Sequence, residues 1–154
     1  PGTPETVTLE TWNKVLEANL TTTMLCTKSC LPRMKEGGGG SIIMVSSIAG
    51  AVGLMGSAGA VAYATAKAGL HGFTMSVAAD YATQNIRANC ICPGGLYAPE
   101  IQPEPFLKNY TKKVPCGRRL ANPDDIKGLV VFLASAASAY ISGEAILMDG
   151  GMHC

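Results

Sequence analysis

The sequence predicts an α/β fold: half of a doubly wound parallel sheet, with about three strands and flanking helices, in a single domain over residues 1–154. Short apolar runs rich in β-branched residues alternate along the chain with longer stretches of helical periodicity. Helices of this length between strands favour parallel pairing with right-handed crossovers. The composition, 47% hydrophobic and 15% charged, suits the buried interior of such a sheet.

Composition also limits the partners that we expect. The net charge is +1 and the chain has no extended basic cluster, so we expect no nucleic-acid binding. No apolar run reaches the roughly 18 residues of a membrane span, and no signal peptide is visible. The low charged fraction indicates that some outer faces are covered by another subunit or by further chain.

The six cysteines fit neither a disulfide framework nor a metal site by their spacing. Cys26 and Cys30 are spaced for one face of a helix, and Cys90 and Cys92 for one face of a strand. Metal-binding knuckles usually have CxxC spacing on turns, which neither pair shows. We therefore expect reduced, buried thiols that act as small hydrophobic side chains, no metal, and a cytoplasmic location.

The first helix is expected from an N-cap at Thr8 to about Met34, after a proline- and threonine-rich lead-in. Three threonines at 21–23 weaken it locally. Asn19 lies on its inward stripe, so we expect a buried amide that needs partners. The apolar residues of that stripe recur at helical spacing: Leu9, Trp12, Leu16, Leu20, Met24 and Leu31.

The next elements follow in turn. Four glycines at 37–40 end the helix and precede a strand over 41–47, which is the wrong order for a phosphate loop. A second long helix is expected over about 62–83, and a second strand over 86–92. Pro93-Gly94-Gly95 ends that strand.

The last third of the chain contains an irregular stretch over 96–116 with four prolines, which suits a lid or substrate loop. A helix over about 122–135 begins with an asparagine cap, a proline and two aspartates. A short strand over 145–148 completes the sheet. His71 and His153 look isolated, and we assign neither a role.

The stretch from Ser47 to Lys67 carries the chemistry. Tyr63 and Lys67 are one helical turn apart on the same face. A free tyrosine titrates near ~10, so a tyrosine that exchanges protons at neutral pH needs a nearby cation that favours its phenolate. Four glycines precede the pair: Gly50, Gly53, Gly56 and Gly59. They lack the tight G-x-G-x-x-G turn, so we expect a mobile loop that covers a pocket. The same glycines only weakly support a phosphate-binding regulatory domain.

Five segments in order resemble the C-terminal part of the short-chain dehydrogenase/reductase family: EANL with Asn19, SIIMVSS ending at Ser47, YATAK, IRANCICPGG and SGEAILMDGG. The resemblance implies a Rossmann-like sheet and an NAD or NADP cofactor. It implies that Tyr63 is the general acid/base and that Lys67 depresses its pKa and binds the nicotinamide ribose. Ser47 would hold the substrate oxygen, and Asn19 would anchor a water linked to Lys67.

The same resemblance implies a shelf for the nicotinamide after the second strand. Pro93, Gly94 and Leu96 would receive the carboxamide, while Gly95 and Tyr97 would contact substrate together with Ser47. The family's N-terminal glycine-rich loop and its residues that select between NAD and NADP have no match in this sequence. The Ser47–Tyr63 loop is longer than expected, and Ala98 or Tyr97 replaces a threonine often found after Pro-Gly.

Three functions remain open from the sequence, and the last of them, a phosphate-binding regulatory α/β domain, has only the loose glycine series in its favour. The first is an oxidoreductase that interconverts a small secondary alcohol and a ketone. The second is a catalytically inactive relative that acts as an association module. In the first two cases the resemblance implies a homodimer or homotetramer built through the two long helices, about 8–34 and 62–83.

Overall fold

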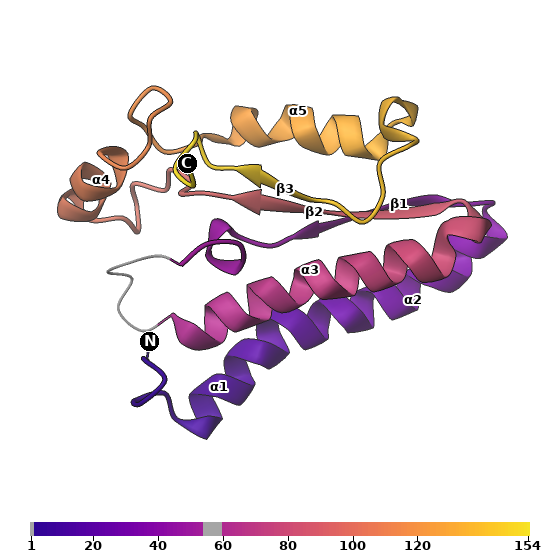
Figure 1. Cartoon of the computed structure of the whole chain (residues 1–154), viewed down its shortest axis with the longest axis horizontal. Coiled ribbons are helices and arrows are strands. Elements are labelled where there is room, and N and C mark those ends of the chain that lie inside the picture. The colour runs from indigo at the N-terminus through magenta and orange to yellow at the C-terminus, as the bar shows by residue number, and fades with distance from the viewer. Residues whose placement is uncertain (1, 54–59) are drawn as a thin grey trace.

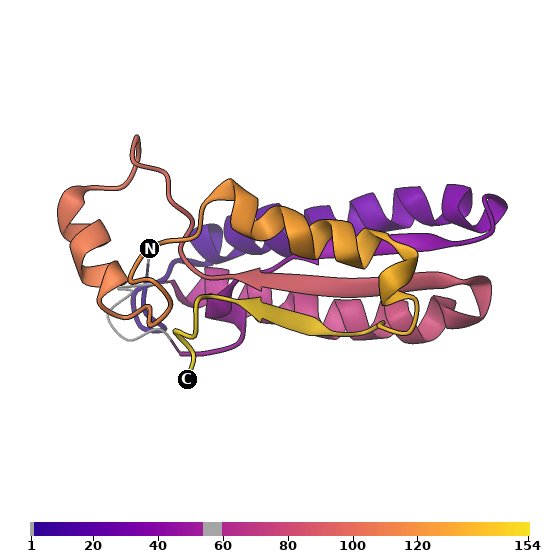
Figure 2. The ribbon, with the colours of Figure 1, turned by 90° about the horizontal axis from the view of Figure 1, so that it is seen from above.

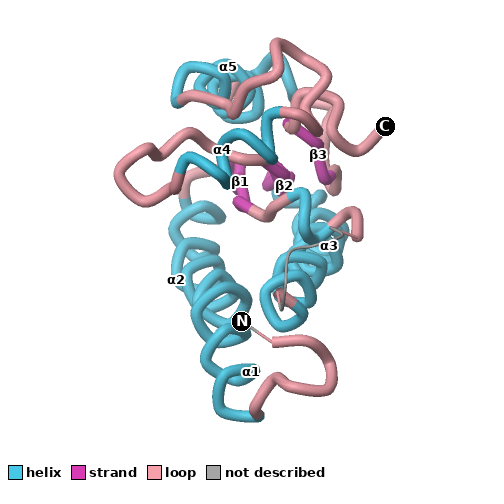
Figure 3. The backbone as a smooth tube through the Cα atoms, turned by 90° about the vertical axis from the view of Figure 1, so that its left-hand side faces the viewer, coloured by secondary structure: helices cyan, strands magenta, loops and turns pink. Residues whose placement is uncertain are grey.

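Three parallel strands lie at the centre of the molecule, and helices cover both faces of their sheet (Figure 1). The structure, a computed structural model, describes residues 2–53 and 60–154. Helices α1, α2 and α3 lie on one face and α5 lies on the other, which is also clear from the end view (Figure 3). The elements in chain order are α1 (Leu9–Leu16), a π-helical turn (Glu17–Thr21), α2 (Thr22–Glu36), β1 (Gly40–Val45), a 3₁₀ turn (Ile48–Gly50), α3 (Val61–Tyr81), a 3₁₀ turn (Ala82–Gln84), β2 (Ile86–Pro93), α4 (Glu104–Thr111), α5 (Pro123–Ala134), a 3₁₀ turn (Ala136–Ser138) and β3 (Ala145–Met148).

The strand order is β1-β2-β3, and both pairings are parallel, which confirms the predicted fold class. Gly40 pairs with Ile86 at the start of β1, and Cys90 pairs with Ala145 at the start of β3. The central strand β2 is buried along nearly its whole length. Helices cover both of its faces, and its two polar side chains have partners: Arg87 donates to the Leu133 carbonyl at 3.0 Å and Asn89 to the Ile141 carbonyl at 2.9 Å.

The first helix differs from the prediction of one continuous helix. Thr8 caps it as predicted, accepting a hydrogen bond from the Thr11 backbone N–H at 3.1 Å. A π-helical turn then separates α1 from α2. The hydroxyl of Thr22 donates to the Glu17 carbonyl at 2.9 Å, and threonine back-bonding of this kind distorts a helix. Leu9, predicted to face inward, is 74% exposed because the short α1 projects beyond the sheet.

The hydrophobic core lies between α3 and the sheet. Cys90 and Cys92 are buried in it as predicted. The expectation of buried thiols was wrong for the other four cysteines, which are exposed: Cys26, Cys30, Cys116 and Cys154. All six cysteines are free thiols. The fully buried cluster consists of Met44, Leu70, Val77, Ala78, Ala88, Cys90 and Cys92.

The segment 96–116, expected to be irregular, contains helix α4. Pro103 lies at its N-cap, and the rings of Phe106 and Tyr110, one turn apart, are 5.5 Å from centroid to centroid. Helix α5 begins as predicted at Asn122, which forms a complete capping box with Asp125.

The carboxyl ends of the strands meet at one end of the molecule, where α4 also lies (Figure 2). Ligands of open α/β sheets bind at this edge, so it positions the candidate site. Among the described residues, no helix is both long and apolar enough to cross a membrane.

Candidate active site

Ser47 lies just beyond the carboxyl end of β1 and caps the 3₁₀ turn that follows. Its hydroxyl accepts a hydrogen bond from the Ala49 backbone N–H at 3.1 Å. The turn packs directly on α3, since a Cβ added at Gly50 would lie 2.6 Å from the carbonyl carbon of Lys67. Glycine at position 50 therefore permits the close approach that places Ser47 beside the first turns of α3.

Tyr63 and Lys67 lie one above the other on α3, as the spacing predicted. The Lys67 ammonium is 5.5 Å from the Tyr63 ring centroid and donates to the Val45 carbonyl at 3.0 Å. Burial lowers the pKa of Lys67 from its ordinary value, because a desolvated ammonium is less stable. Tyr63 remains 37% exposed. Lys67 thus connects the tyrosine to the end of the strand that carries Ser47.

Asn19 lies in the π-helical turn between α1 and α2. It is half-buried rather than buried, and its amide N–H donates to the Val15 carbonyl at 3.0 Å. The turn packs against α3, since a Cβ at Gly69 would lie 2.9 Å from the Leu20 side chain. The structure thus places the turn that carries Asn19 against α3, while the role of Asn19 in holding a water stays a prediction.

The predicted nicotinamide shelf lies at the carboxyl end of β2, and hydrogen bonds to β3 and to α4 hold its backbone in place. Gly94 donates its backbone N–H to Met148 on β3 at 2.9 Å. The Gly95 N–H donates to the Tyr110 hydroxyl at 2.6 Å. Leu96 forms a parallel bridge with Ala121.

The contribution of Tyr110 was not predicted from the sequence. A signal was present, because a proline at position 103 and two aromatic residues spaced by four are typical of the start of a helix.

The backbone of this shelf already holds a primary amide. The Leu96 carbonyl accepts a hydrogen bond from the Gln102 side-chain amide at 2.6 Å, and the Ala98 N–H donates to the same amide at 2.8 Å. A nicotinamide ring bears the same carboxamide group. The shelf therefore fits the cofactor chemically, with an acceptor and a donor spaced for one amide. Leu96 and Tyr97 are both substantially exposed there.

A cavity of about 240 Å³ lies behind the shelf. Burial raises the pKa of Tyr110 in its wall, and the nearby Asp149 charge adds to this effect, so its hydroxyl stays protonated. The candidate catalytic residues Ser47, Tyr63 and Lys67 are not part of the lining. The lining residues are Gly95, Tyr110, Val114, Cys116, Arg119, Ala121, Met148, Asp149, Gly150 and Asp125.

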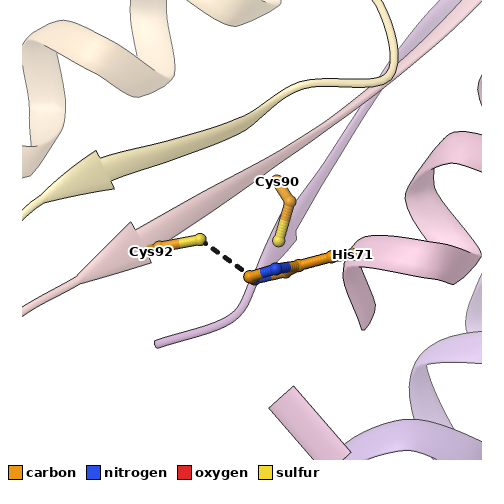
Figure 4. A group of neighbouring side chains, drawn as sticks. All are labelled: His71, Cys90 and Cys92. Atoms are coloured by element: carbon orange, nitrogen blue, oxygen red, sulfur yellow. Dashed lines mark hydrogen bonds between the residues drawn. The ribbon is translucent and has the colours of Figure 1, made fainter. Parts of the chain in front are cut away.

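Neither histidine is isolated, so both sequence interpretations were wrong. His153 lies 2.9 Å from buried Asp149. His71 Nε2 lies 3.0 Å from the Ser46 hydroxyl and 3.2 Å from the Cys92 sulfur, with Cys90 next to it (Figure 4). Hydrogen bonding from Cys92 lowers the pKa of Cys90, because it stabilises the thiolate. These contacts join α3 to β2. They could not be predicted from the spacing of residues along the chain.

Comparison with known proteins along nearly the whole chain shows its family. The sequence model of a family described as enoyl-(acyl carrier protein) reductase matches residues 2–153. The chain belongs to the short-chain dehydrogenase/reductase family.

Part of its Ser47–Tyr63 connection, residues 54–59 with Gly56 and Gly59, lies outside the described residues, so the expected mobile loop stays a prediction there.

Individual relatives agree with this assignment. The chain is 40% identical over 148 residues to dehydrogenase/reductase SDR family member 4 of Rattus norvegicus, covering 94% of the chain and 52% of that protein. It is 38% identical to 3-oxoacyl-(acyl-carrier-protein) reductase of Aquifex aeolicus, covering 92% and 56%. A short-chain dehydrogenase of Leptospira borgpetersenii with bound NAD+ superposes with a TM-score of 0.90 at 38% identity, covering 100% of the chain and 61% of that structure. The chain thus spans about half the length of the curated relatives that it matches.

Proposed function

We propose that this chain forms the catalytic part of an NAD(P)-dependent oxidoreductase that interconverts a secondary alcohol and a ketone. The observation that carries the proposal is the position of Lys67. Its ammonium contacts the Tyr63 ring and the Val45 carbonyl, two residues before Ser47. Family membership and the NAD+ bound to the Leptospira relative support the choice of chemistry.

In this proposal Tyr63 moves the proton. Its hydroxyl donates a proton to the substrate oxygen in ketone reduction and accepts one in alcohol oxidation. The Lys67 ammonium favours the phenolate by its positive charge. Ser47 donates a hydrogen bond to the substrate oxygen as negative charge develops on it. Asn19 contributes from the neighbouring helix through a bound water.

The bound nicotinamide supplies the hydride, and this chain supplies position and electrostatics. Pro93, Gly94 and Leu96 would hold the carboxamide, and the Leu96 carbonyl already accepts a hydrogen bond from the Gln102 side-chain amide. Gly95 and Tyr97 would border the substrate. Lys67 would hold the ribose. The choice between NAD and NADP is made by residues beyond these motifs.

The test is a matched pair of tyrosine variants of the full-length gene product. Tyr63→Phe is expected to lower kcat for secondary-alcohol oxidation at least ~100-fold, because it removes the proton-transfer group and little else. Tyr140→Phe makes the same change at a fully exposed tyrosine and should leave kcat unchanged. Retention of hydride transfer in Tyr63→Phe, measured as NAD(P)H absorbance, would refute the proposal.

A second candidate is the catalytically inactive association module. Exposed apolar side chains on the two long helices favour it, among them Leu25 at 51% and Met75 at 57% exposure. Titration of the full-length gene product with NADH and NADPH separates the two functions. Cofactor binding supports the enzyme, whereas self-association without binding of either nucleotide supports the module.

A further inference from the structure

The side chains of His71, Cys90 and Cys92 form a sulfur-rich cluster (Figure 4). His71 reaches it from α3, and Cys90 and Cys92 reach it from the same face of β2. The His71 nitrogen and the two sulfur atoms all lie within 4.8 Å of one another, and the His71–Cys92 separation is 3.2 Å. The cluster takes no part in the proton transfer proposed above.

These separations suit a shared metal ion. Metal–sulfur bonds of about 2.3 Å and metal–nitrogen bonds of about 2.0 Å place neighbouring ligand atoms roughly 3.5–4 Å apart. The three atoms therefore need only small shifts to reach coordination distances. Both cysteines are fully buried, which keeps water and competing ligands away from the sulfur atoms.

The donor set selects the metal. Two thiols and an imidazole form a soft site, and soft thiolate ligands select Cu(I) among others. The thioether of Met44, opposite Cys90 in the sheet register, adds a third sulfur to this part of the core. Zinc in structural sites requires four ligands in a tetrahedron, one more donor than the cluster supplies.

We propose that His71, Cys90 and Cys92 bind a single thiophilic metal ion, with Cu(I) the ion that the donor set fits best. Binding leaves the copper oxidation state unchanged and releases protons from the thiols. The ion would tie α3 to β2 directly behind Ser46, whose hydroxyl donates to the Lys67 carbonyl at 2.8 Å. Coordination by His71 Nε2 would replace its 3.0 Å contact with Ser46.

The four exposed cysteines would also bind Cu(I), so the experiment starts without them. The full-length gene product carrying Cys26→Ser, Cys30→Ser, Cys116→Ser and Cys154→Ser serves as the background. It is titrated anaerobically with Cu(I) against a chromophoric Cu(I) chelator, and adding Cys92→Ser or His71→Gln to it gives the paired variants. We expect the background to take up one more equivalent of Cu(I) than either paired variant, with at least ~10-fold weaker binding in each variant.

X-ray absorption of the loaded background provides a readout that does not depend on the core variants folding. We expect two or three sulfur neighbours and one imidazole nitrogen around copper. Cu(I) should also raise the thermal midpoint of the background by several degrees, because it binds the folded state. Zn(II) should not displace it. Equal Cu(I) uptake by background and variants, or a copper shell without imidazole, would overturn the proposal.

Discussion

Gln102 occupies, with its side-chain amide, the Leu96 carbonyl that the proposed cofactor would use and the nearby Ala98 N–H. It donates to the Leu96 carbonyl at 2.6 Å and accepts from the Ala98 N–H at 2.8 Å. A nicotinamide carboxamide that binds the same groups must displace it. Gln102 thus acts as an internal competitor at an exposed edge of the shelf.

Replacing this side chain should therefore tighten cofactor binding. Gln102→Ala is expected to lower the Kd for NAD(P)H about 2- to 10-fold, since each released hydrogen bond is worth about 0.5–1.5 kcal/mol. Gln102→Glu keeps the acceptor for Ala98 but cannot donate to Leu96, so its Kd should fall less. Fluorescence titration of the full-length gene product measures both. A higher Kd in Gln102→Ala would show that the amide supports the shelf instead of competing for it.

At the residue scale, the candidate site was predictable where it depends on local spacing and missed where it depends on packing. Tyr63 and Lys67 share a helix face by arithmetic alone. His71 was assigned no role, because its partners Cys92 and Ser46 come from two different strand ends. Knowing that α3 lies across β2 is required before these three residues can be placed together.

The turn that carries Ser47 depends on how closely it approaches α3. Gly50→Ala would place a methyl group 2.6 Å from the Lys67 carbonyl carbon, which is backbone and cannot rotate away. We expect a loss of about 1–3 kcal/mol of unfolding free energy and a fall in kcat, because the turn must shift away from α3.

Gly53→Ala is the matched control for that change. A Cβ at Gly53 would meet no described atom within 4 Å, so we expect its unfolding free energy to stay within about 0.5 kcal/mol of the parent. Urea denaturation and steady-state kinetics compare the two. Equal behaviour of both variants would mean that the contact of this turn with α3 does not position Ser47.

Helix α5 gives a pH-dependent prediction. Hydrogen bonds from Arg119 and from the Asn122 backbone lower the pKa of Asp125 to about 2 from an ordinary value of 3.8. A depressed carboxyl pKa adds stability above pH 4, and this stability is lost as the pH falls toward 2. Asp125→Asn should therefore lower the thermal midpoint at pH 7, and its difference from the parent should shrink between pH 4 and pH 2.

The control for the α5 prediction is a neighbouring aspartate. Asp124 pairs with Lys127 at 2.6 Å, but its side chain is 82% exposed, so Asp124→Asn should change the midpoint little at any pH. Scanning calorimetry across this pH range checks both variants. If the thermal midpoint of Asp125→Asn lies below that of the parent by the same amount at every pH, the assigned role of the carboxylate charge is contradicted.

At the element scale, strands and long helices were predictable because each has a strong period or a continuous apolar run. The prolines within 96–116 concealed α4, although Pro103 lies at its N-cap, where proline is tolerated. The π-helical turn at Glu17–Thr21 could be anticipated only as a weakened helix. Its position depends on two hydrogen bonds, from the Thr22 hydroxyl to the Glu17 carbonyl and from the Thr23 hydroxyl to the Asn19 carbonyl.

At the scale of the whole molecule, both helix layers present apolar side chains to solvent. On the layer of α1 to α3, Leu25 and Met75 are more than half exposed, and on the opposite layer Val131 of α5 is 67% exposed. The charged fraction of 15% is low for a chain of this length. Exposed apolar side chains of this kind favour association with a second copy.

The proposed assembly through the long helices makes a directional prediction. Met75→Glu places a charge on α3 where subunits would meet, and a buried unpaired carboxylate should weaken self-association of the full-length gene product at least ~10-fold. Val131→Glu makes a comparable change on α5, across the sheet, and should leave association intact. Analytical ultracentrifugation over a concentration series distinguishes them. If Val131→Glu dissociates the protein and Met75→Glu does not, the subunits meet through α5, and the long helices are free to face solvent.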